Sequence, residues 1–332
     1  MLFPRDSRLS ETLMLCTAML IGFIVLFKSA DQFVIGSVDT AKNLAISPMT
    51  IGLTIVALGT SAREIFVSMT AALKGEPELA IGNAIGSNIA NIGMVLGITA
   101  LIVPLRLKAN ILKKDLPILI FVTLCCGITL IDYKINIWDG LLLLAGLAVF
   151  LYRLVAGKKP SDEAPVAEEE LDEIPAMTST RALVTLLVSL VFLLASSQLL
   201  VWSAINLAQI FGISELIIGL TVIAVGTSLP ELVVSLTSSL KGQADLAIGN
   251  IVGSNIFNIL AVFSIPCLLA PTEIDPSVLW RDYSLMLLLT IALVAASLGI
   301  RGERKINRIH GSLLLAVWIG YLITLYNTAI PN

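Results

Sequence analysis

Residues 52–97 of this chain read GLTIVALGTSAREIFVSMTAALKGEPELAIGNAIGSNIANIGMVLG, and residues 219–264 read GLTVIAVGTSLPELVVSLTSSLKGQADLAIGNIVGSNIFNILAVFS. At a constant offset of 167 residues, 26 of the 46 positions are identical without a gap. Apolar packing alone would not require two copies of the same polar residues. The duplication therefore points to a shared function for both copies.

The composition around this repeat is that of a membrane protein. Residues of the AVILMFWYC set make up 57% of the 332 positions, and charged residues only 14%. A soluble domain carries about 25% charged residues, so we expect most of the chain to lie in a lipid bilayer. The net charge of −3 gives no reason to expect a nucleic-acid partner.

The sequence lacks the residue patterns of hydrolytic sites. Its single histidine, His310, excludes an HExxH zinc site, and no apolar segment carries the aspartate pair of an intramembrane protease. The four cysteines lie inside apolar stretches without disulfide or zinc spacing, which favours a packing role: Cys16, Cys125, Cys126 and Cys267. We therefore expect no enzymatic activity, no cofactor and no obligatory protein partner.

Apolar segments long enough to cross a bilayer recur along the whole chain. A transmembrane helix needs about 20 apolar residues, and on this basis the sequence predicts ten spans, at approximately 11–36, 46–73, 78–103, 113–131, 136–157, 182–208, 213–240, 245–270, 281–300 and 309–328. The first span resembles a signal peptide. It continues past Asp31 and has a counterpart in the second half, so we expect a retained helix.

The ten spans divide into two halves of five. Residues 1–157 form the first repeat, residues 182–332 the second, and residues 158–181 an acidic linker. Because five is odd, the second repeat enters the membrane inverted, and inverted repeats place substrate sites near the midplane where they meet. The predicted fold is an all-α membrane protein with ten transmembrane helices in two inverted five-helix repeats.

Basic residues predict the orientation of these spans. The loops after odd-numbered spans contain 14 lysines and arginines, whereas the N-terminus and the loops after even-numbered spans contain 5. We therefore expect both termini outside the cytoplasm and the 158–181 linker inside it. The linker lacks the spaced ligands and turn glycine of an EF-hand, so a solvated linker is favoured over a regulatory calcium site.

The polar residues of the repeat are concentrated in Gly59-Thr60-Ser61-Ala62-Arg63-Glu64 and Gly226-Thr227-Ser228-Leu229-Pro230-Glu231. Each lies in the middle of a span. A carboxylate at that depth is costly and marks a functional site by default. The competing interpretation, a glutamate neutralised by protonation or capped by a serine, is less favoured because the arrangement occurs twice.

Glycine and proline beside these acids predict broken helices. Gly59 and Gly226 weaken the helix, and Pro230 removes a backbone donor. Such breaks would free carbonyls beside a protein-lined or aqueous cavity. Oxygen ligands without thiolate or imidazole favour a hard cation such as calcium. The candidate ligands are the side chains of Glu64, Glu231, Ser61, Ser228, Thr60 and Thr227, and the carbonyls of Ala57, Thr60, Ala224 and Thr227.

The following span of each repeat adds a polar stripe. Its residues are spaced i, i+4, i+8 and therefore share one helical face: Asn83, Ser87 and Asn91, then Asn250, Ser254 and Asn258. Lining of a cavity is the favoured role for this stripe. The glycines of the same spans form small-xxx-small pairs that let helices approach closely, so for them packing and cavity lining stay equally open.

At these residues the sequence resembles the calcium/cation antiporter superfamily, whose two repeats carry GTSxPE followed by GNxxGSNIxN. It is similar in particular to bacterial sodium/calcium exchanger-like inner-membrane proteins. The resemblance implies that Glu64 and Glu231 bind calcium together with the carbonyls of Thr60 and Thr227. It implies that the first and sixth spans slide to alternate access. It also implies sodium sites formed by the side chains of Ser61, Ser87, Ser228 and Ser254 and the carbonyls of Ala57 and Ala224. Asn91 and Asn258 would lie beside these sites.

Two residues depart from the family pattern. Asn258 stands where some sodium/calcium exchangers have aspartate, and Arg63 stands where the family has proline. Adjacent helical residues differ by about 100° in direction, so the preferred interpretation is that Glu64 faces the cavity while Arg63 points away. In the alternative, Arg63 sits beside Glu64 as a tethered cation. An arginine near the midplane needs a partner or a water-filled route in either case.

These features predict secondary antiport of calcium for sodium by alternating access at a midplane glutamate site, in a bacterial inner membrane. Calcium and monovalent cations would be the transported partners. Proton coupling is the alternative, favoured by the missing aspartate, and Arg63 leaves open a transport-impaired homologue. A passive channel is disfavoured by the inverted repeat with broken helices. The sequence contains no Walker motif, so we do not expect transport to be driven by ATP.

Overall fold

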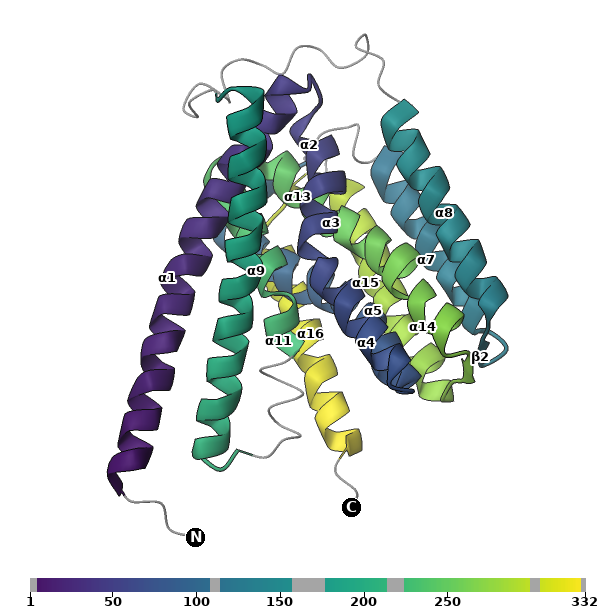
Figure 1. Cartoon of the computed structure of the whole chain (residues 1–332). Coiled ribbons are helices and arrows are strands. Elements are labelled where there is room, and N and C mark those ends of the chain that lie inside the picture. The colour runs from purple at the N-terminus through teal and green to yellow at the C-terminus, as the bar shows by residue number, and fades with distance from the viewer. Residues whose placement is uncertain (1–4, 108–113, 157–176, 214–223, 299–304, 330–332) are drawn as a thin grey trace.

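The computed structural model describes residues 5–107, 114–156, 177–213, 224–298 and 305–329, and nearly all of them lie in helices (Figure 1). The label η marks a π-helix. The helices of the first half are α1 (Arg5–Asn43), α2 (Pro48–Ile51), η1 (Gly52–Val56), α3 (Ala57–Thr60), α4 (Ala62–Leu73), α5 (Pro77–Ala90), η2 (Asn91–Leu96), α6 (Gly97–Ile102), α7 (Leu116–Leu130) and α8 (Ile137–Ala156). Those of the second half are α9 (Ser179–Ile210), α11 (Ala224–Thr227), α12 (Leu229–Leu240), α13 (Ala244–Phe257), η6 (Asn258–Val262), α14 (Ser264–Leu269), η7 (Val278–Tyr283), α15 (Ser284–Leu298) and α16 (Arg308–Ala329).

These helices stand where the sequence predicts spans. Within the described ranges, seven helices are long and apolar enough to cross a membrane, and Pro48–Thr60 with Ala62–Leu73 forms an eighth, bent crossing. The shorter apolar helices α7 and α12 occupy the fourth and seventh predicted spans. Residues 214–223 of that seventh span lie outside the described residues. So does most of the predicted 158–181 linker, of which only its last residues are described.

Helix α1 is longer than predicted. It has 39 residues and extends beyond the predicted 11–36 segment at both ends. A hydropathy pattern marks only the part of a helix that faces lipid, so polar turns that continue the helix past the hydrocarbon are missed. Helices α1 and α16 have their outer ends on the same side of the molecule, opposite the adjoining ends of α8 and α9 (Figure 1).

The two spans that carry the polar stripes form the centre of the molecule. The span Pro77–Ile102 is 78% buried and the span Ala244–Leu269 is 83% buried, whereas Ile137–Leu154 and Arg308–Thr328 are each only 17% buried. The peripheral helices therefore face lipid, and the repeat sequence lies inside the protein. Helix α13 of the second repeat packs tightly on the first repeat, because its glycines Gly249 and Gly253 lie against the backbone of η1 and the residues next to it.

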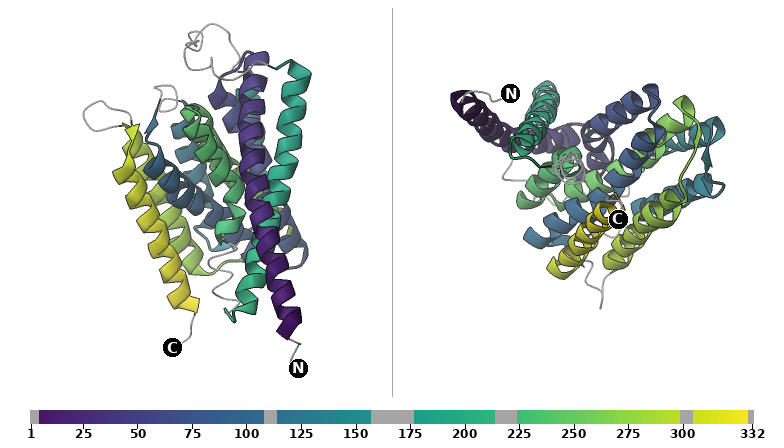
Figure 2. Two further views of the ribbon diagram at one scale, coloured as in Figure 1. Left: turned by 90° about the vertical axis from the view of Figure 1, so that its left-hand side faces the viewer. Right: turned by 90° about the horizontal axis from the view of Figure 1, so that it is seen from below.

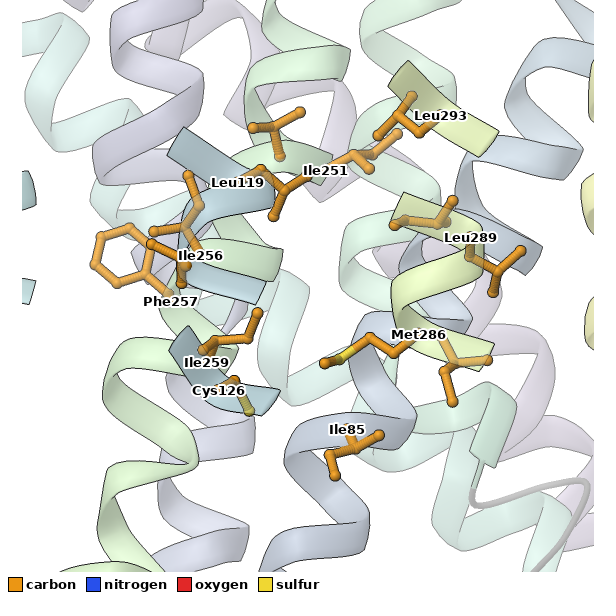
Figure 3. Close-up of a cluster of buried hydrophobic side chains, with 14 of the residues drawn as sticks. Ile85, Leu119, Cys126, Ile251, Ile256, Phe257, Ile259, Met286, Leu289 and Leu293 are labelled. Carbon is orange, nitrogen blue, oxygen red and sulfur yellow. The ribbon is translucent and has the colours of Figure 1, made fainter. Parts of the chain in front are cut away.

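Apolar side chains from both halves fill the space around these central spans. Ile85 on α5, Phe257 on α13, Met286 on α15 and Leu119 on α7 belong to one continuous buried cluster (Figure 3). Cys126 lies in the same cluster, and so does Cys267. Both cysteines are buried and free, which agrees with the predicted packing role.

Helices α1 and α9 form an antiparallel pair along one side of this core (Figures 1 and 2). A side chain at Gly36 would meet the Leu186 backbone nitrogen at 2.7 Å, and one at Gly22 would meet the Leu200 side chain at 2.9 Å. Glycine is thus required at both crossing points for the backbones to approach. Helices α1 and α9 are therefore in close contact at both glycines.

This pair contacts the two repeats unequally. Helix α1 packs along α12, and Asp31 forms an ion pair with Lys241 at 2.7 Å. The repeat-related contact would join α9 to α4, and in the part of the chain that the structure describes these two helices make no comparable contact. The residues equivalent to Asp31 and Lys241 are Gln198 and Lys74. The structure therefore shows one of two possible asymmetric arrangements, the one in which α1 contacts α12 and α9 does not contact α4 to a similar extent.

Two short antiparallel ladders join the halves. Strand β1 (Leu105–Arg106) pairs with β4 (Lys305–Ile306), and β2 (Lys134–Ile135) pairs with β3 (Thr272–Glu273). The β2–β3 ladder carries an ion pair of 2.9 Å between Lys134 and Glu273. This contact raises the pKa of Lys134 and lowers the pKa of Glu273. Each ladder takes one strand from each half, so neither half can form a ladder alone.

Candidate cation-binding site

Both copies of the Gly-Thr-Ser motif interrupt a helix at the serine. Ser61 separates α3 from α4 with a bend of 40°, and Ser228 separates α11 from α12. Glycine two residues earlier has a packing reason as well, because a side chain at Gly59 would meet Leu190 at 2.9 Å and one at Gly226 would overlap Val201. Both glycines thus lie against α9.

Backbone hydrogen bonds continue up to each break. The Ser61 amide still donates to the Ala57 carbonyl at 2.9 Å, and the Thr60 hydroxyl oxygen lies 3.3 Å from the same carbonyl oxygen. The predicted release of the Ala57 carbonyl is therefore wrong in this arrangement, because the first helix bends after this bond has formed. The Ser228 amide donates to the Val225 carbonyl at 3.2 Å.

The two glutamates begin the helices that follow the breaks. Glu64 lies in the first turn of α4 and Glu231 in the first turn of α12. Each is only 1% exposed, and the carboxylates are close enough to interact electrostatically. The structure thus brings together, at one buried place, two acids that are 167 residues apart in sequence.

Several buried oxygens of the two repeats, including one of each glutamate, have no hydrogen-bond partner. In the described part of the chain, 13 buried side-chain polar atoms have no partner, and eight of them are oxygens in four repeat-related pairs. Native proteins leave few buried polar groups unpaired, so a set that follows the repeat symmetry indicates a purpose. The eight atoms are Ser61 and Ser228 Oγ, Glu64 and Glu231 Oε2, Asn91 and Asn258 Oδ1, and Asn88 and Asn255 Oδ1.

The first asparagine of each stripe holds the glutamate in place. Asn83 Nδ2 donates to the Glu64 carbonyl at 3.0 Å and to Ser68 Oγ at 2.9 Å. Asn250 Nδ2 donates in the same way to the Glu231 carbonyl at 3.3 Å and to Ser235 Oγ at 3.0 Å. The sequence stripe contains both asparagines, but their positioning role follows only from these contacts.

Thr60 links the first repeat to the stripe of the second. Its hydroxyl lies 3.2 Å from Asn250 Oδ1 and 3.4 Å from Ser254 Oγ, and it also interacts with the Glu231 side chain. Ser254 and Ser87 are buried on their stripes, whereas Thr227 is partly exposed. The predicted residues of both repeats therefore meet at a single interface.

Both stripes end in a π-helix. Segment η2 begins at Asn91, and η6 begins at the equivalent Asn258. A π-turn inserts one extra residue and is frequent at functional sites. It changes the direction of the following side chains, so a stripe deduced from ideal α-helical spacing ends here.

Asn88 and Asn255 are repeat-related buried residues that the spacing argument did not single out. Each follows the stripe serine by one residue and so lies off the i, i+4, i+8 face. Both are 1% exposed, with unpartnered oxygens. Their identity in the two copies was the available signal, since the Gly-Ser-Asn triplet occurs unchanged in each repeat.

Arg63 has a specific partner in the other repeat. Its Nη1 donates to the Gly226 carbonyl oxygen at 2.6 Å. The guanidinium is also near enough to Glu64 and Glu231 to interact electrostatically with both carboxylates. The preferred expectation, that Arg63 points away from the acids, is therefore not met, because a long side chain can reach across the break although its backbone faces elsewhere.

The donor set fits a hard cation. Carboxylate, hydroxyl and amide oxygens line the site, and they are the ligands that calcium and sodium prefer. Among the described residues there is no cluster of three or more histidine, cysteine or acidic side chains. Two carboxylates supply the charge here, and neutral oxygens would have to complete any coordination shell.

Comparison with known proteins agrees with this arrangement. The family "Sodium/calcium exchanger protein" matches residues 14–156 and 181–327, which is most of both repeats. The chain belongs to the sodium/calcium exchanger family. CaxA of Alkalimonas amylolytica is 48% identical over 93% of this chain and 98% of its own length. The inner membrane protein YrbG of Escherichia coli is 38% identical over 95% of this chain and 98% of its own length.

A solved exchanger shares the fold. The sodium-calcium exchanger NCX_Mj superposes with a TM-score of 0.80 at 32% identity, covering 95% of this chain and 99% of its own. Its ten-helix inverted-repeat architecture confirms the predicted fold class. This exchanger-family chain is thus a transmembrane antiporter of calcium and other cations, and its family is one of transporters rather than enzymes.

Proposed function

We propose that this protein exchanges calcium for sodium by alternating access at a single midplane site centred on Glu64 and Glu231. The observation that carries the proposal is the set of repeat-related buried oxygens without partners that includes Glu64 and Glu231 Oε2 and Ser61 and Ser228 Oγ. An unsatisfied polar group in the bilayer interior costs several kcal/mol, and a bound cation would remove this cost for many oxygens at once. Thr60 of the first repeat also contacts Asn250 and Ser254 of the second stripe, which supports the proposal.

Calcium is the cation that the two carboxylates favour. Carboxylate oxygens are typical calcium ligands, and hydroxyl and amide oxygens can raise the ligand number toward the six to eight that calcium takes. The names of relatives agree with this choice, since MaX1 of Methanosarcina acetivorans is called a sodium/calcium exchanger and is 27% identical over 93% of this chain.

The carboxylates are tested by neutral substitutions of the same shape. Glu64→Gln and Glu231→Gln should each abolish calcium flux into proteoliposomes, because the site would lose one of its two carboxylates. Calcium-45 uptake driven by an outward sodium gradient measures this. Normal uptake by Glu231→Gln, in protein that elutes as a single species, would refute the glutamate site.

Proton coupling is the second candidate, and Asn258 is the observation that favours it. The site has two carboxylates where some exchangers have three acidic groups, so it has less charge with which to hold sodium ions. Liposomes with a sodium gradient at equal pH, and liposomes with a pH gradient in the absence of sodium, separate the two. Uptake under the sodium gradient alone supports sodium exchange, whereas uptake under the pH gradient alone supports proton exchange.

We also propose that the termini lie outside the cytoplasm of a bacterial inner membrane and that the α1/α9 pair moves during transport. The basic-residue asymmetry supports the orientation, and the close fit of α1 with α9 supports their movement as one unit. A single cysteine introduced at a position in 158–181 should resist a membrane-impermeant thiol reagent in intact cells and react after lysis. Labelling from outside would reverse the orientation.

A further inference from the structure

The two copies of the site motif differ in charge at one position. The first repeat has Arg63 where the second has Pro230, each directly before its glutamate. An inverted repeat with identical motifs would present equal charge from both halves. Here one half contributes an additional positive charge to the interface, and the contacts of Arg63 show where this charge is held.

Arg63 is anchored at the break of the opposite repeat. Its Nη1 donates to the Gly226 carbonyl at 2.6 Å, two residues before Ser228. Side chains at Gly226 are excluded by contact with Val201 of α9. The arginine therefore reaches a backbone position that is fixed by packing, and its guanidinium cannot move away from the acids without breaking this bond.

The charge of the site follows from these contacts. Glu64 and Glu231 contribute two negative charges when ionised, and Arg63 contributes one positive charge that acts on both. The net charge is then −1, whereas a site with proline at both positions would carry −2. A monovalent cation neutralises the first site, and a divalent cation neutralises the second.

We propose that Arg63 is a fixed cation of the transport site, which weakens calcium binding and takes the place of one mobile monovalent cation in each cycle. This inference rests on the proposed antiport at Glu64 and Glu231. It identifies Arg63 as the residue that sets the number of coupling ions. A purely structural anchor at Gly226 would change stability but would leave ion competition unchanged.

The test measures calcium-45 binding to the purified full-length protein, with displacement by sodium. Arg63→Ala removes the charge and keeps the helix, and Arg63→Pro restores the motif of the second repeat. Both should bind calcium at least about tenfold more tightly, since each removes a nearby like charge from a low-dielectric site. Both should also show a higher Hill coefficient for displacement by sodium. Arg63→Lys keeps the charge and should stay near wild type.

The control is Arg106→Ala, which removes the positive charge of an exposed side chain on strand β1, outside both motifs. It should leave calcium affinity and the Hill coefficient unchanged. Wild-type affinity and Hill coefficient in folded Arg63→Ala would overturn the proposal, and this variant decides if Arg63→Pro does not fold.

Glu231→Gln separates the two levels of inference. If calcium binding depends on Glu231 and is insensitive to Arg63, only the fixed-cation proposal fails. If calcium binding in wild type does not depend on Glu231, the proposed function fails, and the role of Arg63 fails with it.

Discussion

Asn250 connects the two repeats beside Glu231. Its amide group donates to the Glu231 carbonyl and to Ser235, and its oxygen accepts from Thr60 of the first repeat. It is fully buried. One side chain thus fixes the first turn of α12 relative to the break of the opposite half, and so determines where the Glu231 carboxylate lies.

Replacing Asn250 by alanine should therefore weaken both the fold and the site. Three hydrogen bonds are lost and buried partners are left unpaired, which we expect to cost about 1–3 kcal/mol of stability. Calcium affinity should fall about tenfold or more, because a shift of the glutamate by a fraction of an ångström changes the coordination shell. Thermal unfolding and calcium-45 binding measure the two effects.

Asn206→Ala is the matched control for this substitution. Asn206 is partly exposed, and its amide donates only to the Trp202 carbonyl on its own helix. Its loss should leave calcium affinity unchanged. Equal effects of the two substitutions would show that Asn250 has no special connection with the site.

At the residue scale, the sequence predicts the site residues that occur in both copies of the repeat. Glu64 and Glu231 can be chosen from sequence because a carboxylate in mid-span is costly and occurs twice. The partner of Arg63 could not be chosen in this way, since Gly226 is 163 residues away and only tertiary packing brings them together. The Ala57 carbonyl shows the same limit, because the residue at which a helix bends decides which carbonyls stay bonded.

At the scale of elements, the inequality between α1 and α9 defines the conformation. Asp31 of α1 and Lys241 after α12 form an ion pair, and exchange of the two repeats would place Gln198 beside Lys74 instead. Only one of these two contacts joins opposite charges. We call the arrangement in which the two repeats exchange their roles the mirror state. The state described here is favoured by an ion pair that the mirror state lacks.

Two single substitutions should shift this equilibrium in opposite directions. Asp31→Asn removes the existing ion pair and should raise the population of the mirror state. Gln198→Asp gives Lys74 an acidic partner in that mirror state and should raise its population further. Spin labels on α1 and α12, with distances measured by pulsed electron paramagnetic resonance, report the populations.

Charge exchange provides the control. Asp31→Lys combined with Lys241→Asp restores an ion pair of reversed polarity and should return the distance distribution toward wild type. A distribution that is the same in wild type, Asp31→Asn and Gln198→Asp would show that this ion pair has no influence on the conformation. The sequence identified these helices as spans, but their unequal packing is visible only in the folded chain.

At the scale of the whole molecule, the two repeats complete one another. The β1–β4 and β2–β3 ladders each take one strand from each half, and the cation site takes one glutamate from each. Apolar residues of both halves also share one buried cluster. The number and order of the spans could be predicted from hydropathy, but strands of two residues give no sequence signal.

A chain divided within the linker should therefore still assemble. Residues 1–157 and 182–332, expressed together as separate polypeptides, should co-purify and restore calcium uptake, because every shared contact named above is non-covalent. Each half expressed alone should be unstable, since its ladder strands and half of the buried cluster would lack partners. Co-purification through an affinity tag on one half measures assembly, and stable, monomeric single halves would contradict the prediction.

The pairing of the ladders also has a consequence for the ancestry of the chain. Leu105 and Arg106 of β1 correspond by the 167-residue offset to Thr272 and Glu273 of β3, and the Lys-Ile-Asn triplet that begins at Lys134 recurs at Lys305. Strand β3 is thus the counterpart of β1, and β4 is the counterpart of β2. In the structure β1 pairs with β4 and β2 pairs with β3, so no strand pairs with its own counterpart. Two identical ancestral proteins of half this length, inserted in opposite directions, would have formed the same two ladders between subunits. In a single chain the two copies are free to differ, and Arg63 and Pro230 occupy equivalent positions with different residues.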